Sequence, residues 1–175
     1  MAKGDLIERK YLGHFIDEAF DTTYATTSYV RLGEDLEEYS IEMNAETEEK
    51  TNILGETSFK VKGYKPQASV STYYAKEGSV LYAKLKAIID NRSTGAALNT
   101  SVVDVIMSVD ESGNITAGED TYREDVTVVP QSLGGGTDGV QIPFEIHYVG
   151  NRTKGTFDLK TKTFTAGAAT QTTSE

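Results

Sequence analysis

Two stretches of the chain alternate apolar and polar side chains in the way that a half-buried β-strand does. The first covers Tyr39 to Met43 and the second covers Phe59 to Val61. The segment between them, Ala45 to Leu54, is predicted to be a loop of roughly ten residues, which exceeds the two to five residues usual for a hairpin. The pattern therefore predicts two long strands joined by a long connection.

This connection is rich in acid, and there is no Lys or Arg between Leu32 and Glu49. Near its end, Ile53 and Leu54 have no obvious place in the domain's own core. A long loop that is not low-complexity usually carries function, so we interpret it as a docking loop made of Ala45, Glu46, Thr47, Glu48, Glu49, Lys50, Thr51, Asn52, Ile53 and Leu54. An acidic run by itself is more often a solvated surface, and that alternative stays open.

The first 27 residues show no clean period, and the segment 21–23 is typical of a loop. We expect an N-terminal arm that packs only where something else offers a groove. Its loosely spaced apolar residues are Tyr11, Phe15, Ile16 and Phe20. A short first strand is predicted from Ser28 to Leu32.

One helix is predicted, with Ser79 as its N-cap, an apolar stripe from Leu81 to Ile89 and an end near Asp90 and Asn91. The remaining patterns predict strands and turns. Strands are expected over 68–74, 103–109, 122–129, 140–148 and 157–164, turns over 110–114 and 150–155, and a disordered tail over 166–175.

About eight strands and one helix predict a mainly β fold over residues 28–165, after the arm 1–27 and before the tail 166–175. Two packed antiparallel sheets, or a small open barrel, bury such strands most simply. The expected architecture is a two-sheet antiparallel β-sandwich or open barrel with one flanking α-helix and a long protruding hairpin loop.

The composition narrows the classes of partner. A formal net charge of −10 argues against a protein that grips nucleic acid through its phosphates, because such proteins need a basic face. It does not argue against a surface past which nucleic acid slides. The chain has no Cys, no apolar run long enough to span a bilayer, and no apolar signal region in 1–20. We therefore expect synthesis in the cytoplasm and no membrane partner.

The sequence gives little support for the hypothesis that the protein is an enzyme. His14 and His147 have no nearby Cys or spaced carboxylate that would make a metal site, and no nucleophile elbow, P-loop or dinucleotide fingerprint occurs. The glycines of 134–136 lack the Lys and the helix of an anion cradle, and 110–114 lacks the bidentate Glu of a calcium loop. We expect no catalytic residue, no metal and no cofactor.

Two features are expected to need an external partner: the long acidic hairpin with its apolar tip, and the arm before residue 28. A β domain with such extensions is suited to assembly with copies of itself, because strand pairing between subunits removes exposed edges.

The order and residues of three segments resemble a known family. They are Asn52-Ile-Leu-Gly-Glu-Thr-Ser-Phe-Lys-Val-Lys-Gly-Tyr64, then Glu77-Gly-Ser-Val-Leu-Tyr-Ala-Lys-Leu-Lys-Ala-Ile-Ile-Asp90, then a strand opened by Thr100-Ser-Val-Val-Asp-Val105. Over roughly Tyr29 to Phe164 the chain resembles the major tail tube proteins of long-tailed (siphovirus-like) bacteriophages and prophages of Gram-positive bacteria.

The resemblance implies a structural virion protein that forms hexameric rings, stacked into the tail tube through which the genome is delivered. It implies that the loop Ala45 to Leu54 reaches an adjacent ring and that the arm 1–20 lies at an interface. It also implies an electronegative lumen, for which Glu38, Glu42 and Glu46 are the candidates. Like charge would let double-stranded DNA pass without specific binding.

The implied partners are copies of the chain itself, a tail tip or initiator protein, a tape measure protein and a terminator protein, all in the virion tail. Lys60 and Lys62 lie on the polar face of the partner strand, within reach of Glu38 or Glu42, and leave open which sheet lines the bore. One alternative is the tube of a contractile tail or of a phage-tail-like injection particle, which the sequence does not separate. Another is a non-catalytic ligand-binding β-sandwich, which usually needs an exposed Trp platform that this chain lacks.

Overall fold

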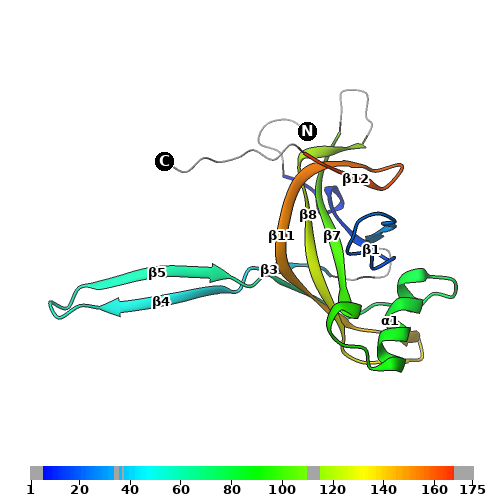
Figure 1. Cartoon of the computed structure of the whole chain (residues 1–175), viewed down its shortest axis with the longest axis horizontal. Helices are drawn as coiled ribbons and strands as arrows, with labels where there is room; N and C mark the ends of the chain where they lie inside the picture. Colours follow the sequence, from blue (N-terminus) through cyan, green and yellow to red (C-terminus); the bar gives the residue numbers. More distant parts are fainter. Residues whose placement is uncertain (1–5, 34–35, 37, 110–114, 168–175) are drawn as a thin grey trace.

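The computed structural model describes residues 6–33, 36, 38–109 and 115–167. Its centre is one eight-stranded antiparallel sheet that curls into a half-barrel (Figure 1). The strand order is β2 (Tyr29–Leu32), β1 (Leu12–Asp17), β7 (Asn99–Val109), β8 (Ile115–Pro130), β11 (Phe144–Asp158), β6 (Gln67–Val70) and β3 (Ile41–Glu42), with β12 (Thr163–Ala166) paired to the far end of β11. The expected mainly β fold is confirmed, in the form of one open, curled sheet.

The other elements lie around this sheet. The helix α1 (Val80–Asn91) lies on the concave side, near one end of the long strands (Figure 1). A long two-stranded hairpin, β4 (Ala45–Thr51) and β5 (Thr57–Tyr64), projects away from the domain on the opposite side. Short elements complete the described chain: the 3-10 turns η1 (Arg9–Tyr11) and η2 (Gly95–Leu98), and the small hairpin β9 (Gly134–Gly136) and β10 (Gly139–Gln141).

Both faces of the sheet are packed, which explains why β7 is almost continuously buried. Val102 points to the concave face, while Val103 and Val105 point to the other. The concave cluster takes Leu81 and Leu85 from α1. The opposite cluster consists of Phe15, Tyr29, Val103, Val105, Met107 and Phe157. Each face thus has its own core, and α1 covers only part of the concave one.

The predicted helix is confirmed together with its cap. The Ser79 side chain accepts a hydrogen bond from the Tyr82 backbone N–H at 3.3 Å, which satisfies one of the free donors of the first turn. At the other end Arg92 adopts a left-handed conformation with φ 48°, and its N–H reaches the carbonyls of Ile88 and Ile89. These caps fix the length of the helix at three turns.

The prediction of a loop over Ala45 to Leu54 is wrong for most of its length, because Ala45–Thr51 form β4. The signal was hidden because both faces of this strand are exposed and polar, so no apolar alternation marks it. The strand predicted before it is much shorter than expected. Only Ile41–Glu42 pair with the sheet, and Asn44 leaves the strand conformation with φ 42°.

The prediction of an arm over residues 1–27 is also wrong for its middle part. Leu12–Asp17 form β1, an inner strand between β2 and β7. Phe15 is 4% exposed and Ile16 is fully buried, so these two side chains fill the protein's own core and not an interface. The strand has no apolar alternation because it is buried on both faces, like β7.

The predicted turn over 150–155 is wrong, because β11 runs through it to Asp158. Two register shifts against β8 absorb the extra residues, one between Tyr148 and Gly150 and one between Gly150 and Thr153. Gly150 and Asn151 have φ 113° and 58°. Phe157 therefore belongs to β11, and the last strand is only Thr163–Ala166. The predicted turn 110–114 lies outside the described residues, as does the predicted tail from residue 168 onward.

Candidate assembly surfaces

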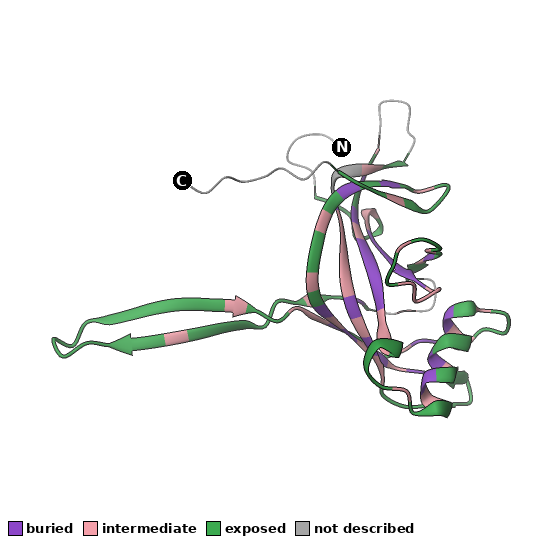
Figure 2. Ribbon diagram, in the orientation of Figure 1, coloured by how far each residue is buried: buried purple, intermediate pink, exposed green. Residues whose placement is uncertain are grey.

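The β4–β5 hairpin stands clear of the sheet, and almost every residue along it is exposed (Figure 2). Six of the fourteen exposed large hydrophobic side chains of the described residues lie between Met43 and Tyr64: Met43, Ile53, Leu54, Phe59, Val61 and Tyr64. An isolated two-stranded hairpin is marginally stable at best in water. The described domain therefore leaves the apolar side chains of the hairpin exposed to solvent.

The two faces of the hairpin differ in chemistry because of its register. Thr47 lies opposite Val61 and Glu49 opposite Phe59, so one face carries two exposed apolar side chains among Thr and Glu. The other face is charged. There Glu48 lies opposite Lys60 and forms ion pairs with Lys50 at 3.2 Å and with Lys62 at 3.1 Å. The hairpin thus turns Lys60 and Lys62 toward Glu48, and not toward Glu38 or Glu42 as the sequence suggested.

The hairpin tip is an ordered turn built on one side chain. The Asn52 Oδ1 accepts hydrogen bonds from the backbone N–H groups of Leu54 and Glu56, at 2.9 and 3.0 Å, and its Nδ2 donates to the Glu56 carboxylate at 2.7 Å. Gly55 supplies the left-handed residue, with φ 80°. This turn holds Ile53 and Leu54 outward, at 103% and 78% exposure. The tip thus presents two apolar side chains in a fixed frame.

The base of the hairpin is tied at one point. The Lys65 N–H donates to the carbonyls of Met43 and Asn44 at 3.2 Å each, and the Lys65 ammonium pairs with the Glu46 carboxylate. The hydrogen bond and the charge of Lys65 lower the pKa of Glu46 below its usual value. The two chain ends that enter and leave the hairpin are therefore neighbours.

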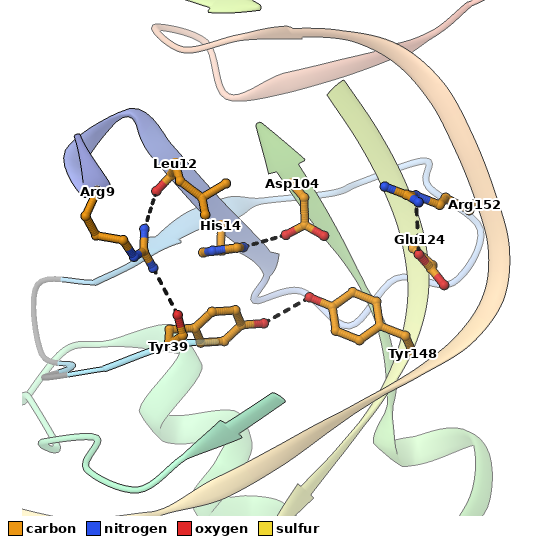
Figure 3. A network of polar contacts seen from close by, with 8 residues as sticks. All are labelled: Arg9, Leu12, His14, Tyr39, Asp104, Glu124, Tyr148 and Arg152. Atoms are coloured by element: carbon orange, nitrogen blue, oxygen red, sulfur yellow. Dashed lines mark hydrogen bonds and ion pairs between the residues drawn. The ribbon is translucent and has the colours of Figure 1, made fainter. Parts of the chain in front are cut away.

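A polar network lies on the concave face, next to the core that α1 covers (Figure 3). The His14 Nδ1 lies 2.6 Å from Oδ1 of Asp104, its partner across β1 and β7. The Tyr39 ring lies over His14 with centroids 4.3 Å apart, and its hydroxyl is 3.0 Å from that of Tyr148. Burial raises the pKa of both tyrosines well above the usual range. Tyr39, which precedes β3 and the hairpin, thus binds to the sheet through His14 and Tyr148.

An open cavity of about 500 Å³ adjoins this network. Its apolar walls come from Leu12, Ile41, Ile106 and the ring of Tyr122. Its polar lining consists of Arg9, His14, Tyr39, Ser40, Asp104 and Arg152. Sequence reasoning missed this site because His14 and Asp104 meet only through the register of two strands that are ninety residues apart.

The loop between β1 and β2, residues 18–28, is held by two carboxylates. The buried Asp17 accepts hydrogen bonds from the N–H groups of Ala19 and Ser28, at 3.1 and 2.7 Å, and Asp21 accepts from Thr23 and Thr26. These hydrogen bonds hold the pKa of Asp21 well below its usual range. The loop has a structural explanation and needs no ligand.

The three glutamates predicted to line a lumen do not share one strand. Glu38 precedes β3, Glu42 lies in β3 opposite Gln67, and Glu46 lies in the hairpin. All three are exposed. Their role as lumen residues stays a prediction, as does the role of Tyr11 and Phe20 at an interface.

Among the described residues, no group of three or more His, Cys, Asp or Glu side chains is arranged to hold a metal ion. The described part of the chain also contains no helix with the length and apolar character required to cross a membrane. His147 pairs with Glu145 on its own strand at 3.2 Å.

Comparison with solved structures gives a likeness in the backbone. No family model matches the chain, and no curated protein matches it. A similar backbone is that of the anti-feeding prophage cap, described as a tube terminating cap and determined by cryo-EM. It is 12% identical, with a TM-score of 0.49 over 89% of this chain and 95% of that chain. At that score the likeness carries no functional assignment.

Proposed function

We propose that this protein is a structural subunit of a phage-type tail, which assembles with copies of itself into stacked rings that form a tail tube. The observation that carries the proposal is the β4–β5 hairpin, whose apolar tip and apolar strand face have no partner among the described residues of the chain. Residues 52–64, 77–90 and 100–105 resemble tail tube proteins, and this resemblance indicates that the assembly is a tube.

The sheet adds a second reason for self-assembly. Among the described strands, β2 ends the row on one side and β3 on the other, so the curled sheet is not closed into a barrel. An exposed strand edge is a template for pairing with another chain. Side-by-side pairing of subunits generates a ring when the rotation between them closes. In this proposal it closes, and the hairpin extends beyond the ring that it belongs to.

The charge of the chain fits a conduit. A net charge of −10 repels DNA phosphates, so a bore lined by this protein would not retain the duplex. In this proposal the rings are hexameric and the genome passes through their centre. The further partners are a tail tip or initiator, a tape measure protein and a terminator.

The test is negative-stain electron microscopy of the purified protein over a concentration series. Rings or hollow tubes with an axial bore are the expected result. Small discrete particles at every concentration would refute the proposal and favour a ligand-binding β domain.

A further inference from the structure

The cavity on the concave face exposes apolar surface to solvent. Ile106 is 40% exposed although it lies on an inner strand of the sheet. Leu12 and Ile41 stand beside it in the cavity wall, each half-buried. A volume of about 500 Å³ lies within the roughly 300–1,000 Å³ typical of ligand pockets. The cavity is therefore large enough to take one or two aliphatic side chains from a partner.

The polar groups around the cavity favour an acidic partner. The Arg9 guanidinium donates to the backbone carbonyls of Leu12 at 2.6 Å and Tyr39 at 3.2 Å, and has no carboxylate partner among the described residues (Figure 3). The Arg152 guanidinium lies 3.7 Å from the Glu124 carboxylate and 4.1 Å from the centroid of Tyr122. The positive charge of Arg9 is thus available to a carboxylate that arrives from outside.

A buried nitrogen of His14, a residue that lines the cavity, is unpaired. The His14 ring is buried, and its Nε2 has no hydrogen-bond partner in the described part of the chain. Leaving such a buried atom unpaired is unfavourable. Docking of a segment that moves the covering side chains would give this atom a partner.

The hairpin tip has the complementary chemistry. Ile53 and Leu54 are its apolar side chains, and Glu56 supplies a carboxylate beside them. Residues 45–57 contain four glutamates and one lysine. The tip thus matches the apolar wall of the cavity, and Glu56 is opposite in charge to Arg9.

The tip cannot reach the cavity of its own chain. Ile41, in the cavity wall, lies only a few residues before the hairpin, and the seven residues of β4 carry the tip about 24 Å away from that point. Figure 1 shows the hairpin directed away from the concave side. An occupant with this chemistry must come from a second copy.

We infer that the hairpin tip of one copy docks into the concave cavity of a second copy. In that arrangement Ile53 and Leu54 pack against Leu12, Ile41 and Ile106, and Glu56 pairs with Arg9. The inference rests on the proposed self-assembly and names the surface that receives the hairpin.

The chain contains no cysteine, so single cysteines report contacts without background. Two variants of the full chain, Ile53→Cys at the tip and Ser40→Cys at the cavity wall, are mixed and oxidised, and the mixed disulfide dimer is quantified. The matched control replaces Ser40→Cys with Ser132→Cys, since Ser132 is also an exposed serine but lies beyond β8. We expect the dimer linked between positions 53 and 40 in at least tenfold excess over the control dimer. Adding Leu54→Asp to the Ile53→Cys chain should abolish that excess.

Electron microscopy of the same mixtures separates the two proposals. Rings or tubes together with no excess of the dimer that involves position 40 would overturn the docking site and leave the proposed function standing. An excess of that dimer without rings or tubes would support the docking site and count against the tube. If the dimer shows no excess and no rings or tubes form, both proposals are refuted.

Discussion

His14 and Asp104 face each other across β1 and β7, with the His14 Nδ1 2.6 Å from the carboxylate Oδ1. The His14 side chain is 4% exposed and that of Asp104 is 19% exposed. Both residues are therefore removed from most of the solvent that would otherwise solvate their charge and dipoles. The pair holds the centre of the concave face, where the Tyr39 ring packs on His14.

The first prediction concerns this pair. His14→Ala leaves the Asp104 carboxylate without its partner and opens a hole under Tyr39, so we expect the free energy of unfolding to fall by about 2 to 4 kcal/mol. Urea denaturation measures it. His147→Ala is the matched control, because His147 is half-exposed and pairs only within its own strand. Its expected loss is below about 0.5 kcal/mol, and equal losses in the two variants would contradict the prediction.

The second prediction is a dependence on alkaline pH. Burial and the hydrogen bond to the Asp125 carboxylate raise the pKa of Tyr24 to about 12, whereas an unfolded tyrosine titrates at about 10. The neutral Tyr24 phenol therefore stabilises the fold fully below about pH 10, and this contribution is lost as the pH rises toward 12.

Tyr24→Phe removes the titrating group. Between about pH 10 and pH 11.5, the free energy of unfolding of this variant should fall less steeply than that of the wild type. Tyr64→Phe, on the exposed hairpin, should keep the slope of the wild type. Parallel slopes for Tyr24→Phe and the wild type would show that Tyr24 does not carry the effect.

The third prediction tests the junction of β11 and β12. A Cβ at Gly155 would overlap the Thr165 carbonyl oxygen and the Phe164 ring, well inside van der Waals contact. Gly155→Ala should therefore force β12 away from β11 and destabilise the protein by about 1 to 3 kcal/mol in urea. Gly63→Ala is the control, because no atom lies within 4 Å of its added Cβ. A neutral Gly155→Ala would mean that β12 moves at no cost.

Elements defined by local pattern could be predicted from the sequence. The helix α1 was found because its cap and apolar stripe are contained in a short segment, and β5 because Phe59 and Val61 alternate with polar side chains. The strand β4 was missed because both of its faces are polar and exposed, and β1 because both of its faces are buried. A strand shows the alternation that predicts it only when one face is apolar and the other is polar, as in β5.

The receiving cavity could not be predicted in the same way. Its walls combine Leu12, Ile41, Ile106 and Tyr122 from four different strands or their ends, and only the register of the sheet brings them together. The exposed pair Ile53 and Leu54, by contrast, was visible as apolar residues in an acidic segment. One half of the proposed contact was thus visible in a local pattern, and the other half required the fold.

The fourth prediction is that the hairpin contributes little to the stability of the domain. Because the Lys65 N–H contacts the Met43 and Asn44 carbonyls, residues 45–64 can be replaced by a Gly-Asn-Gly turn without moving the sheet. The free energy of unfolding should change by no more than about 1 kcal/mol, since the removed side chains are mostly exposed. In the same variant the rings should not stack, and no tubes should form. Loss of the cooperative unfolding transition would show that the hairpin is part of the core.

The fifth prediction isolates the tip. The double change Ile53→Asp and Leu54→Asp replaces two exposed apolar side chains with charges, so the domain should unfold at the temperature of the wild type, within about 2 °C. Stacking should nevertheless be lost, because two carboxylates in place of Ile53 and Leu54 cannot pack against the apolar wall of the cavity without a large desolvation cost. Thermal unfolding followed by circular dichroism measures the first effect, and negative-stain electron microscopy the second.

The matched control for the tip exchanges the two residues, as Ile53→Leu with Leu54→Ile. Apolar area and volume are conserved in this variant, so tubes should form as in the wild type. Normal tubes from the double Asp variant would remove the docking role from the tip. Loss of tubes in both variants, with folding intact, would instead indicate that the receiving surface fits these two side chains in this order. A cavity walled by Leu12, Ile41 and Ile106 would discriminate in this way only if it packed closely against each side chain.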